Sequence, residues 1–357
     1  MTKKWIAWNA PLRRFRQFKA MPFAPVTIRG EAAAKINLSL DVFDRRNDSY
    51  HNIDSVMQAV SLADGVTIAV APLICPKNKS SAGVCHDKSD HLTNNRGLHR
   101  AFFCQESSIS IELQSTRPVP MDETNTAVKA AKLWCQQAGA TNLKIEIYLE
   151  KHIPTGAGLG GGSSDAATVL RLLNQLAAEA KITAAPLSSK LLPELAAMIG
   201  ADVPFCLHGG IARCRGIGEI VEPLGSLPKW FLILAIPPFS FSTAERFREL
   251  DQLDKECWRH PDTESLLKAI DSQDLAGINE TAFNVFSNLQ DTDVISIETA
   301  LLETGADMVR MTGSGPVVFA LYAAEKHRSL SLQRLKASAH KDTMFLPAYF
   351  KRSGSSF

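Results

Sequence analysis

The chain has 357 residues, of which 45% are apolar and 21% are charged, and its formal net charge is +2. This composition is ordinary for a globular enzyme, and the length predicts one large or two moderate domains. No basic stripe with interleaved aromatic residues occurs, so nucleic acid is disfavoured as a partner. No apolar run reaches the length needed to cross a bilayer, so a membrane partner is also disfavoured.

The first 25 residues are predicted to be a disordered basic extension. Lysine and arginine precede the first acidic residue, but no serine occurs before Ser39, whereas transit peptides are rich in serine. Three interpretations stay open: a disordered extension, a transit peptide, or a true start further along, near Met21. The seven cysteines form no CxxC pair, which favours free thiols in a reducing cytoplasm. An organelle location is the alternative if the extension is a transit peptide.

Alternating apolar and polar residues over 32–42 predict a half-buried strand, with Lys35, Asn37, Ser39 and Asp41 on its polar face. The polar, weakly periodic residues 75–107 predict a surface insertion. The other predicted elements are strands over 53–70 and 143–149, a helix ending at Gly139, a helix over 187–199, strands near Ile211 and Phe231, and a strand–turn–strand over 308–322. Strands and helices mix without a regular βαβ rhythm, so the predicted class is α+β.

Five glycines separate a predicted strand from a long predicted helix: Gly156, Gly158, Gly160, Gly161 and Gly162. Glycine permits positive φ and close approach of backbone N–H groups to a phosphate, and a helix start adds further donors. The Walker pattern is excluded because no Lys-Ser or Lys-Thr follows. The GxGxxG match does not indicate a dinucleotide-binding fold, because more helix follows where that fold needs a strand. The sequence therefore predicts a different kind of phosphate-binding loop.

The string PTGAGLGGGSSDAA resembles the phosphate-binding motif of the GHMP kinase superfamily, which includes galacto-, homoserine and mevalonate kinases. AAAKINLSL resembles its first motif and MTGSGPVVFA its third. The resemblance implies a two-domain α+β fold, with a ribosomal protein S5 domain 2-like N-terminal domain and a ferredoxin-like C-terminal domain. The implied domains are an ATP-binding domain over 26–228, which carries the insertion, and a second domain over 229–357.

Within the superfamily, RRNDSYHNIDSVMQAVSLAD, GADVPFCLHGGIARCRGIGE and PPFSFST are similar to the 4-diphosphocytidyl-2-C-methyl-D-erythritol kinase family. The resemblance implies transfer of the γ-phosphoryl group of ATP to the 2-hydroxyl of that substrate, in non-mevalonate isoprenoid synthesis. It implies ATP and Mg²⁺ as cofactors, a small-molecule partner, and a monomer or weak homodimer. No metal ligand is identified from the sequence.

The resemblance assigns catalysis to Lys35 and Asp202. Asp202 is the implied base, and its alternative role is an N-cap of the next helix, which aspartate fills well. A cation at Lys35 would keep that carboxylate ionised and oriented, and Asn37 would be a neutral neighbour of the substrate. A surface strand commonly carries lysine, so Lys35 by its position alone has an ordinary explanation.

The implied substrate-binding residues are Asn37, Tyr50, His51, Asp202, Thr243 and Phe247, with the backbone near Ile217. Tyr50 and Phe247 would stack on the cytosine base, and His51 would hydrogen-bond its edge. The implied ATP-binding residues are Asn125 beside the adenine and, around the phosphates, Pro154, Gly156, Gly158, Leu159, Gly160, Gly161, Gly162, Ser163 and Ser164. Gly313, Ser314 and Gly315 would form a second turn beside this loop.

Several positions depart from the family pattern. Asp44 and Ser49 stand where glycine is expected, and Val285 and Ser287 replace two acidic residues, which puts the role of that segment in doubt. A serine at positive φ is tolerated at some cost. The insertion carries cysteine and histidine, but their spacing fits no common zinc finger: Cys75, Cys85, His86, His91, His99 and Cys104.

Three competing functions remain open at this stage. The first is another GHMP-type kinase acting on mevalonate, homoserine or a sugar, which would leave Tyr50, His51 and Phe247 without a purpose. The second is a silent binding relative, which would be expected to lack Lys35 or Asp202. The third is a nicotinamide-dependent enzyme that uses the GxGxxG string.

Overall fold

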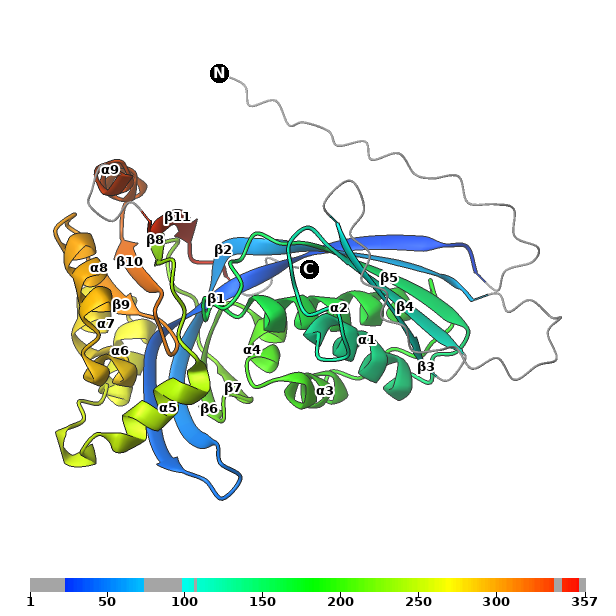
Figure 1. Cartoon of the computed structure of the whole chain (residues 1–357), viewed down its shortest axis with the longest axis horizontal. Helices are drawn as coiled ribbons and strands as arrows, with labels where there is room; N and C mark the ends of the chain where they lie inside the picture. Colours follow the sequence, from blue (N-terminus) through cyan, green and yellow to red (C-terminus); the bar gives the residue numbers. More distant parts are fainter. Residues whose placement is uncertain (1–22, 74–97, 106–107, 337–341, 353–357) are drawn as a thin grey trace.

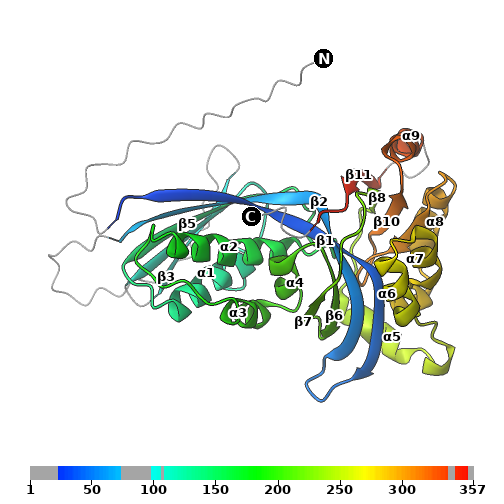
Figure 2. The ribbon, with the colours of Figure 1, turned by 180° about the vertical axis from the view of Figure 1, so that it is seen from behind.

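The computed structural model describes residues 23–73, 98–105, 108–336 and 342–352. Two β-sheets, each with its own set of helices, lie at opposite ends of an elongated molecule (Figure 1). The view from behind shows that the long hairpin of β1 (Val26–Arg45) and β2 (His51–Pro72) runs along the larger sheet and then turns down between the two ends (Figure 2). Most of the predicted basic extension lies outside the described residues. In the part described, no helix is long and apolar enough to cross a bilayer.

The larger sheet has seven strands in the described part of the chain. Their order is β3–β4–β5–β2–β6–β7, with β1 pairing with β2 away from this path. Of the strand pairs that the described residues form in this sheet, only β4–β5 is parallel. The strands are β1 (Val26–Arg45), β2 (His51–Pro72), β3 (His99–Gln105), β4 (Ile109–Ser115), β5 (Leu143–Glu150), β6 (Ile211–Gly216) and β7 (Ile220–Pro223).

Strand β3 corrects the prediction that residues 75–107 are wholly a surface insertion. It pairs with β4 from His99 opposite Ser115 to Gln105 opposite Ile109. Ala101 and Phe103 are buried while Phe102 is exposed. The period-two pattern of a half-buried strand is therefore present, but the polar residues before it obscure it.

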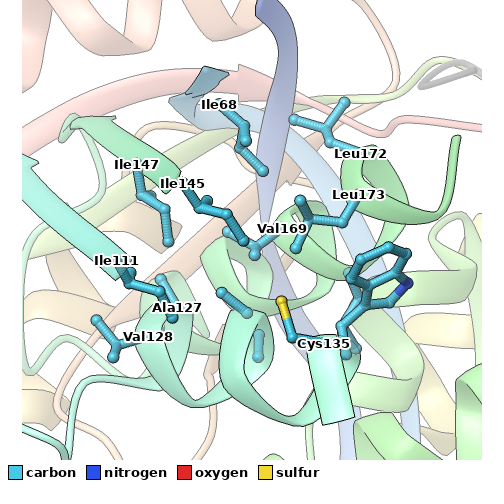
Figure 3. Close-up of a cluster of buried hydrophobic side chains, with 14 of the residues drawn as sticks. Ile68, Ile111, Ala127, Val128, Cys135, Ile145, Ile147, Val169, Leu172 and Leu173 are labelled. Atoms are coloured by element: carbon cyan, nitrogen blue, oxygen red, sulfur yellow. The ribbon is translucent and has the colours of Figure 1, made fainter. Parts of the chain in front are cut away.

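Four helices lie along one face of this sheet: α1 (Thr126–Gln137), α2 (Gly161–Ala178), α3 (Leu191–Ile199) and α4 (Val203–His208). The core between helices and sheet contains Ile145, Cys135 and Leu173 (Figure 3). Helix α3 begins later than the predicted start at 187. The Asn174 side chain bonds both backbone groups of Leu187, at 2.6 Å and 3.2 Å, so that residue is held in a tertiary contact before the helix begins.

The smaller sheet is antiparallel, with the order β11–β8–β10–β9. Its strands are β8 (Phe231–Ile236), β9 (Met308–Met311), β10 (Val318–Tyr322) and β11 (Met344–Tyr349). The helices are α5 (Thr243–Gln252), α6 (Thr263–Asp271), α7 (Leu275–Thr281), α8 (Thr292–Leu302) and α9 (Glu325–Lys336), with 3-10 turns η1 (Lys255–Cys257) and η2 (Val285–Leu289).

Strand β1 is buried on both faces where the two ends of the molecule meet, so the prediction of a half-buried strand over 32–42 is wrong. Its apolar side packs in a cluster that also contains residues of β8 and β10. Its polar side is covered by later segments: the Ser39 hydroxyl donates to the Phe283 carbonyl at 2.9 Å, and the Asn37 N–H donates to Thr312 Oγ1 at 2.8 Å. Four polar side chains are thereby enclosed at this junction: Lys35, Asn37, Ser39 and Asp41.

Candidate active site

Two clefts meet at the glycine loop. The larger holds about 750 Å³ and the smaller about 330 Å³, and Gly158, Gly160 and Ser163 line both. The larger cleft also contains Lys35, Asn37, Tyr50, His51, Asp202, Ile217, Thr243, Phe247, Gly313 and Ser314. The smaller also contains Asn125, Pro154, Gly156, Leu159, Gly161 and Gly162. A group passed from one cleft to the other would cross the shared loop residues.

The glycine loop adopts a backbone that other residues rarely adopt. Gly156, Gly158 and Gly160 have φ of 74°, 69° and 71°. Gly160 is also the N-cap of α2 and offers no capping side chain. The first N–H groups of any helix have no intrahelical partners, and here no N-cap side chain accepts from them. Such a terminus is an anion-binding element.

A second glycine turn closes against the first. Gly313 and Gly315 have φ of 60° and 83°. A Cβ added to Gly313 would lie 3.5 Å from the Gly158 carbonyl oxygen. Asn284 holds this turn, because its side chain donates to the carbonyls of Met311 and Gly313 at 2.9 Å each. The two turns together form one small-residue surface at the junction of the clefts.

Lys35 and Asp202 are brought together in the larger cleft. The Lys35 ammonium lies 3.3 Å from Asp202 Oδ2 and donates to Asn37 Oδ1 at 3.0 Å. The lysine side chain is 6% exposed and the aspartate side chain 30% exposed. Register shifts of β1 occur between Ala33 and Lys35 and between Asn37 and Ser39. Bulges of this kind redirect side chains, and here they bracket the two residues that point at the site.

The Asp202 carboxylate does not cap α4. Asp202 occupies the N-cap position, but its side chain makes no capping hydrogen bond and its backbone is already helical, with φ of −82° and ψ of −12°. A capping side chain needs an extended backbone to reach the N–H groups of the first turn. The carboxylate is therefore directed to Lys35 and the cleft, and not to its own helix.

Asn37 holds the lysine in place. Its carbonyl oxygen accepts from Lys35, and its amide group donates to Ser55 Oγ at 2.8 Å. Ser55 in turn donates to the carbonyl of Ser39. These bonds leave Asn37 as an orienting neighbour of the Lys35 ammonium.

The far end of the larger cleft carries the predicted aromatic residues. The His51 ring stacks on Phe247, with centroids 4.8 Å apart and an interplanar angle of 16°. His51 Nε2 lies 2.9 Å from Asp251 Oδ1, which was not predicted from the sequence. Tyr50 is 59% exposed at the rim. Arg45 and Arg248 also line this cleft, so its open end carries two cations that the sequence analysis did not single out.

Thr243 and Ile217 both line the larger cleft. Thr243 Oγ1 is 3.1 Å from Ser314 Oγ, which links α5 to the second turn. The Ile217 N–H donates to Glu219 at 2.6 Å. That backbone donor is thus already engaged within its own turn.

Two residues of the implied ATP site have structural roles. Ser164 lines neither cleft, and its buried hydroxyl donates to the Gly161 carbonyl at 3.0 Å within α2, so its expected contact with the phosphates stays a prediction. Asn125 lines the smaller cleft, yet its side chain caps α1 by accepting from the N–H groups of Ala127 and Val128.

The departures from the family pattern are accommodated locally. Ser49 has φ of 72°, the left-handed backbone that explains the usual glycine. Val285 is fully buried in η2. An aspartate there would have to be desolvated, so the valine suits the packing around it.

A cluster of charges that the sequence analysis did not single out lies beside the smaller cleft. The Lys151 ammonium contacts Asp64 and Asp165, and all three side chains are buried. Burial raises the pKa of Asp165 to about 7, although Lys151 opposes that shift. The sequence contains one sign of this cluster, because charged residues interrupt the otherwise apolar strings SLADGV and YLEKHIP.

Metal-binding residues do not gather in the described part of the chain: no group of three or more His, Cys, Asp or Glu side chains is placed to hold an ion. Cys75, Cys85, His86 and His91 of the zinc alternative lie outside the described residues. His99 belongs to β3.

The comparisons first define the class. Residues 125–210 match the family model described as the GHMP kinases N terminal domain. The crystal structure of a homoserine kinase from Cytophaga hutchinsonii is similar over 95% of this chain and 98% of its own, with a TM-score of 0.63 and 19% identity. That likeness concerns the fold alone, and the fold is the two-sheet GHMP kinase fold.

The closer likenesses define the family. A Geobacillus kaustophilus protein named 4-diphosphocytidyl-2-C-methyl-D-erythritol kinase is 37% identical over 82% of this chain and 87% of its own length. A crystal structure of 4-(cytidine 5'-diphospho)-2C-methyl-D-erythritol kinase covers 92% of this chain and 100% of its own, with a TM-score of 0.66 and 27% identity. The chain belongs to the 4-diphosphocytidyl-2-C-methyl-D-erythritol kinase family.

The packing of Lys35 on the glycine loop leads to a stability prediction. A Cβ at Gly160 would lie 2.9 Å from Lys35 Cγ. Gly160→Ala is expected to lose about 1–3 kcal/mol of unfolding free energy from overpacking, in addition to the cost of its left-handed backbone.

Gly139→Ala is the matched control, since Gly139 also has positive φ, 59°, but a Cβ there would meet nothing within 4 Å. Urea unfolding of the two variants measures the difference. Equal losses would contradict the claim that the Lys35 stem packs against Gly160.

Proposed function

We propose that this protein transfers the γ-phosphoryl group of ATP to the 2-hydroxyl of 4-diphosphocytidyl-2-C-methyl-D-erythritol, a step of non-mevalonate isoprenoid synthesis. Family membership supports the substrate. The observation that carries the proposal is that two clefts share Gly158, Gly160 and Ser163, with the Lys35–Asp202 pair on the larger side. Phosphoryl transfer needs a donor and an acceptor held on either side of a phosphate-binding element.

The smaller cleft is the proposed ATP site. The phosphates would lie on the N–H groups of the glycine loop and the start of α2, and the adenine would lie toward Asn125 at the start of α1. Mg²⁺ would enter as part of the ATP complex and neutralise charge on the transferred phosphoryl group. No residue of the chain is assigned to hold the ion.

The Lys35–Asp202 pair is the proposed catalytic centre. The hydroxyl oxygen of the substrate attacks the γ-phosphorus, the bond to the bridging oxygen breaks, and ADP leaves with that oxygen. The hydroxyl proton passes to the Asp202 carboxylate, which lies partly open to the cleft. Lys35 orients the carboxylate of the proposed base and, next to Gly160, lies beside the loop that would hold the phosphates.

The cytidyl group of the substrate is proposed to bind at the aromatic end. Tyr50 would offer one ring face for the base, and Phe247 would offer the face that His51 does not cover. The His51–Asp251 hydrogen bond orients the imidazole. Arg45 and Arg248 supply cations suited to the diphosphate. Thr243 would contact the polar part of the substrate that lies between its cytosine base and its reacting hydroxyl.

The remaining proposals concern organisation and location. Residues 26–228 are proposed as the ATP-binding domain and 229–357 as the second domain, with a site built from both. A cytoplasmic location is proposed because the described cysteines are free: Cys135, Cys206, Cys214 and Cys257. That the protein is a monomer or a weak homodimer stays a prediction.

The substrate is tested with a coupled assay of ADP release. Turnover is expected with 4-diphosphocytidyl-2-C-methyl-D-erythritol and not with mevalonate, homoserine or galactose, because only the first fills the aromatic end of the larger cleft. Activity on mevalonate with none on the cytidyl alcohol would move the protein to another GHMP-type function.

The base is tested with Asp202→Asn, which keeps the side-chain volume but removes the proton acceptor. kcat is expected to fall by about 10²–10⁴-fold, while ATP affinity measured by calorimetry stays unchanged. Asp271→Asn, an exposed carboxylate on α6, is the control and should keep full turnover. Near-full activity of the Asp202 variant would exclude this carboxylate as the base.

The base pocket is tested with Phe247→Ala. Loss of one stacking face, worth about 1–3 kcal/mol, is expected to raise KM for the cytidyl alcohol about 5- to 150-fold while KM for ATP is unchanged. Phe43→Ala is the control, because Phe43 is similarly large but lines neither cleft. An equal rise in both KM values would point to general loss of structure instead.

A further inference from the structure

The glycine loop is supported from beneath by three buried charges, Asp64 of β2, Lys151 after β5 and Asp165 of α2. The Lys151 ammonium lies 2.6 Å from Asp165 Oδ2 and also forms a short contact with Asp64. The residues are 1%, 6% and 3% exposed, respectively. We refer to them as the loop cluster.

The loop cluster is joined directly to the proposed ATP site. Asp64 Oδ1 accepts from the N–H groups of His152 and Ile153, at 2.5 Å and 2.8 Å, just before the loop begins. A Cβ on Gly161, the first residue of α2, would lie 3.6 Å from the Lys151 ammonium. Lys151 and Asp165 both line the smaller cleft. A change of charge in the cluster therefore changes the electrostatic potential at the proposed phosphate position.

The charges of the loop cluster do not cancel. One ammonium faces two carboxylates, so the cluster has a net charge of −1 when both carboxylates are ionised. Asp165 Oδ1 is buried and has no hydrogen-bond partner among the described residues. An uncompensated negative charge at this depth is costly, and it repels the phosphates of a nucleotide bound beside it.

In the described part of the chain, Lys151 is the cation that contacts Asp165. The groups acting on Asp165 are Lys151, which favours its ionised form, and Asp64, which disfavours it. From α4, the Cys206 thiol faces the same region, and burial raises its pKa, so it stays neutral. Burial raises the pKa of Asp165 itself to about 7. The carboxyl is thus divided between its two forms near neutral pH.

We propose that Asp165 takes up a proton from solvent when the phosphates of ATP bind the glycine loop, so that nucleotide binding neutralises the loop cluster. This rests on the proposed function, since it takes the smaller cleft as the ATP site. No bond of the nucleotide changes. Asp165 is then a positioning residue, which acts on the phosphates through the charge of the cluster beneath the loop.

The direction of the pH dependence follows from linkage. Below the pKa of Asp165, about 7, the cluster is already neutral and binding needs no proton. Above it, each binding event must bring one proton, so affinity falls by up to about tenfold per pH unit. Titration of the nucleotide itself would act in the opposite sense, because its more ionised form binds the N–H donors of the helix start more tightly.

The test is calorimetry of ADP binding at saturating Mg²⁺ and pH 7.5, with the full chain, in buffers of different ionisation enthalpy. The wild type is expected to take up more protons per ADP than Asp165→Asn, by at most about 0.8. This limit is the fraction of Asp165 that is ionised at pH 7.5, half a pH unit above a pKa of about 7. Glu112→Gln is the control: Glu112 is a buried carboxylate paired with Arg100 at the far edge of the sheet, and its variant should match the wild type.

Equal proton uptake by the wild type and Asp165→Asn would overturn the proposal. If circular dichroism shows that the variant does not fold, the wild type alone decides: a fall in ADP affinity from pH 6 to pH 9 supports the coupling, and constant affinity overturns it. Binding without proton uptake overturns this inference only. Absence of any nucleotide binding overturns the proposed function with it.

Discussion

The contact on which the site depends is the packing of Lys35 between the glycine loop and Asp202. Its stem lies against Gly160, and its ammonium lies 3.3 Å from the Asp202 carboxylate. Three segments far apart in the sequence are joined by this one side chain: β1, the loop before α2, and the start of α4. Because glycine alone leaves room for the stem, the conformation of the loop and the position of the ammonium are set together.

The burial of the polar face of β1 explains why the site lies where the two sheets meet. Buried polar groups are tolerated when each has a partner, and here the partners come from the C-terminal half: Thr312 for Asn37 and Phe283 for Ser39. The same hydrogen bonds that satisfy the strand hold the second glycine turn against the first. The contacts that pack the two halves together therefore also bring the parts of the site together.

Charge is distributed unevenly between the two clefts. The larger cleft contains a lysine paired with one carboxylate, and two arginines at its open end. The smaller cleft lies above a lysine shared by two carboxylates. A buried carboxylate in excess of the nearby cation has an ionisation state that depends on what binds beside it. The proposed acceptor side thus contains the proposed base, and the proposed nucleotide side contains a carboxylate whose charge is proposed to respond to the ligand.

Local patterns in the sequence determined the α+β class, the glycine loop feeding a helix, and most strands, because backbone period and turn chemistry are properties of neighbouring residues. The residues proposed for catalysis and for the cytidyl group were named from motif resemblance. Tertiary structure alone decided that β3 joins the sheet, that the polar face of β1 is enclosed, and that Ser164 faces inward. It also decided that Asp64, Lys151 and Asp165 meet. Contacts between distant segments depend on how whole elements pack, and no local pattern encodes that.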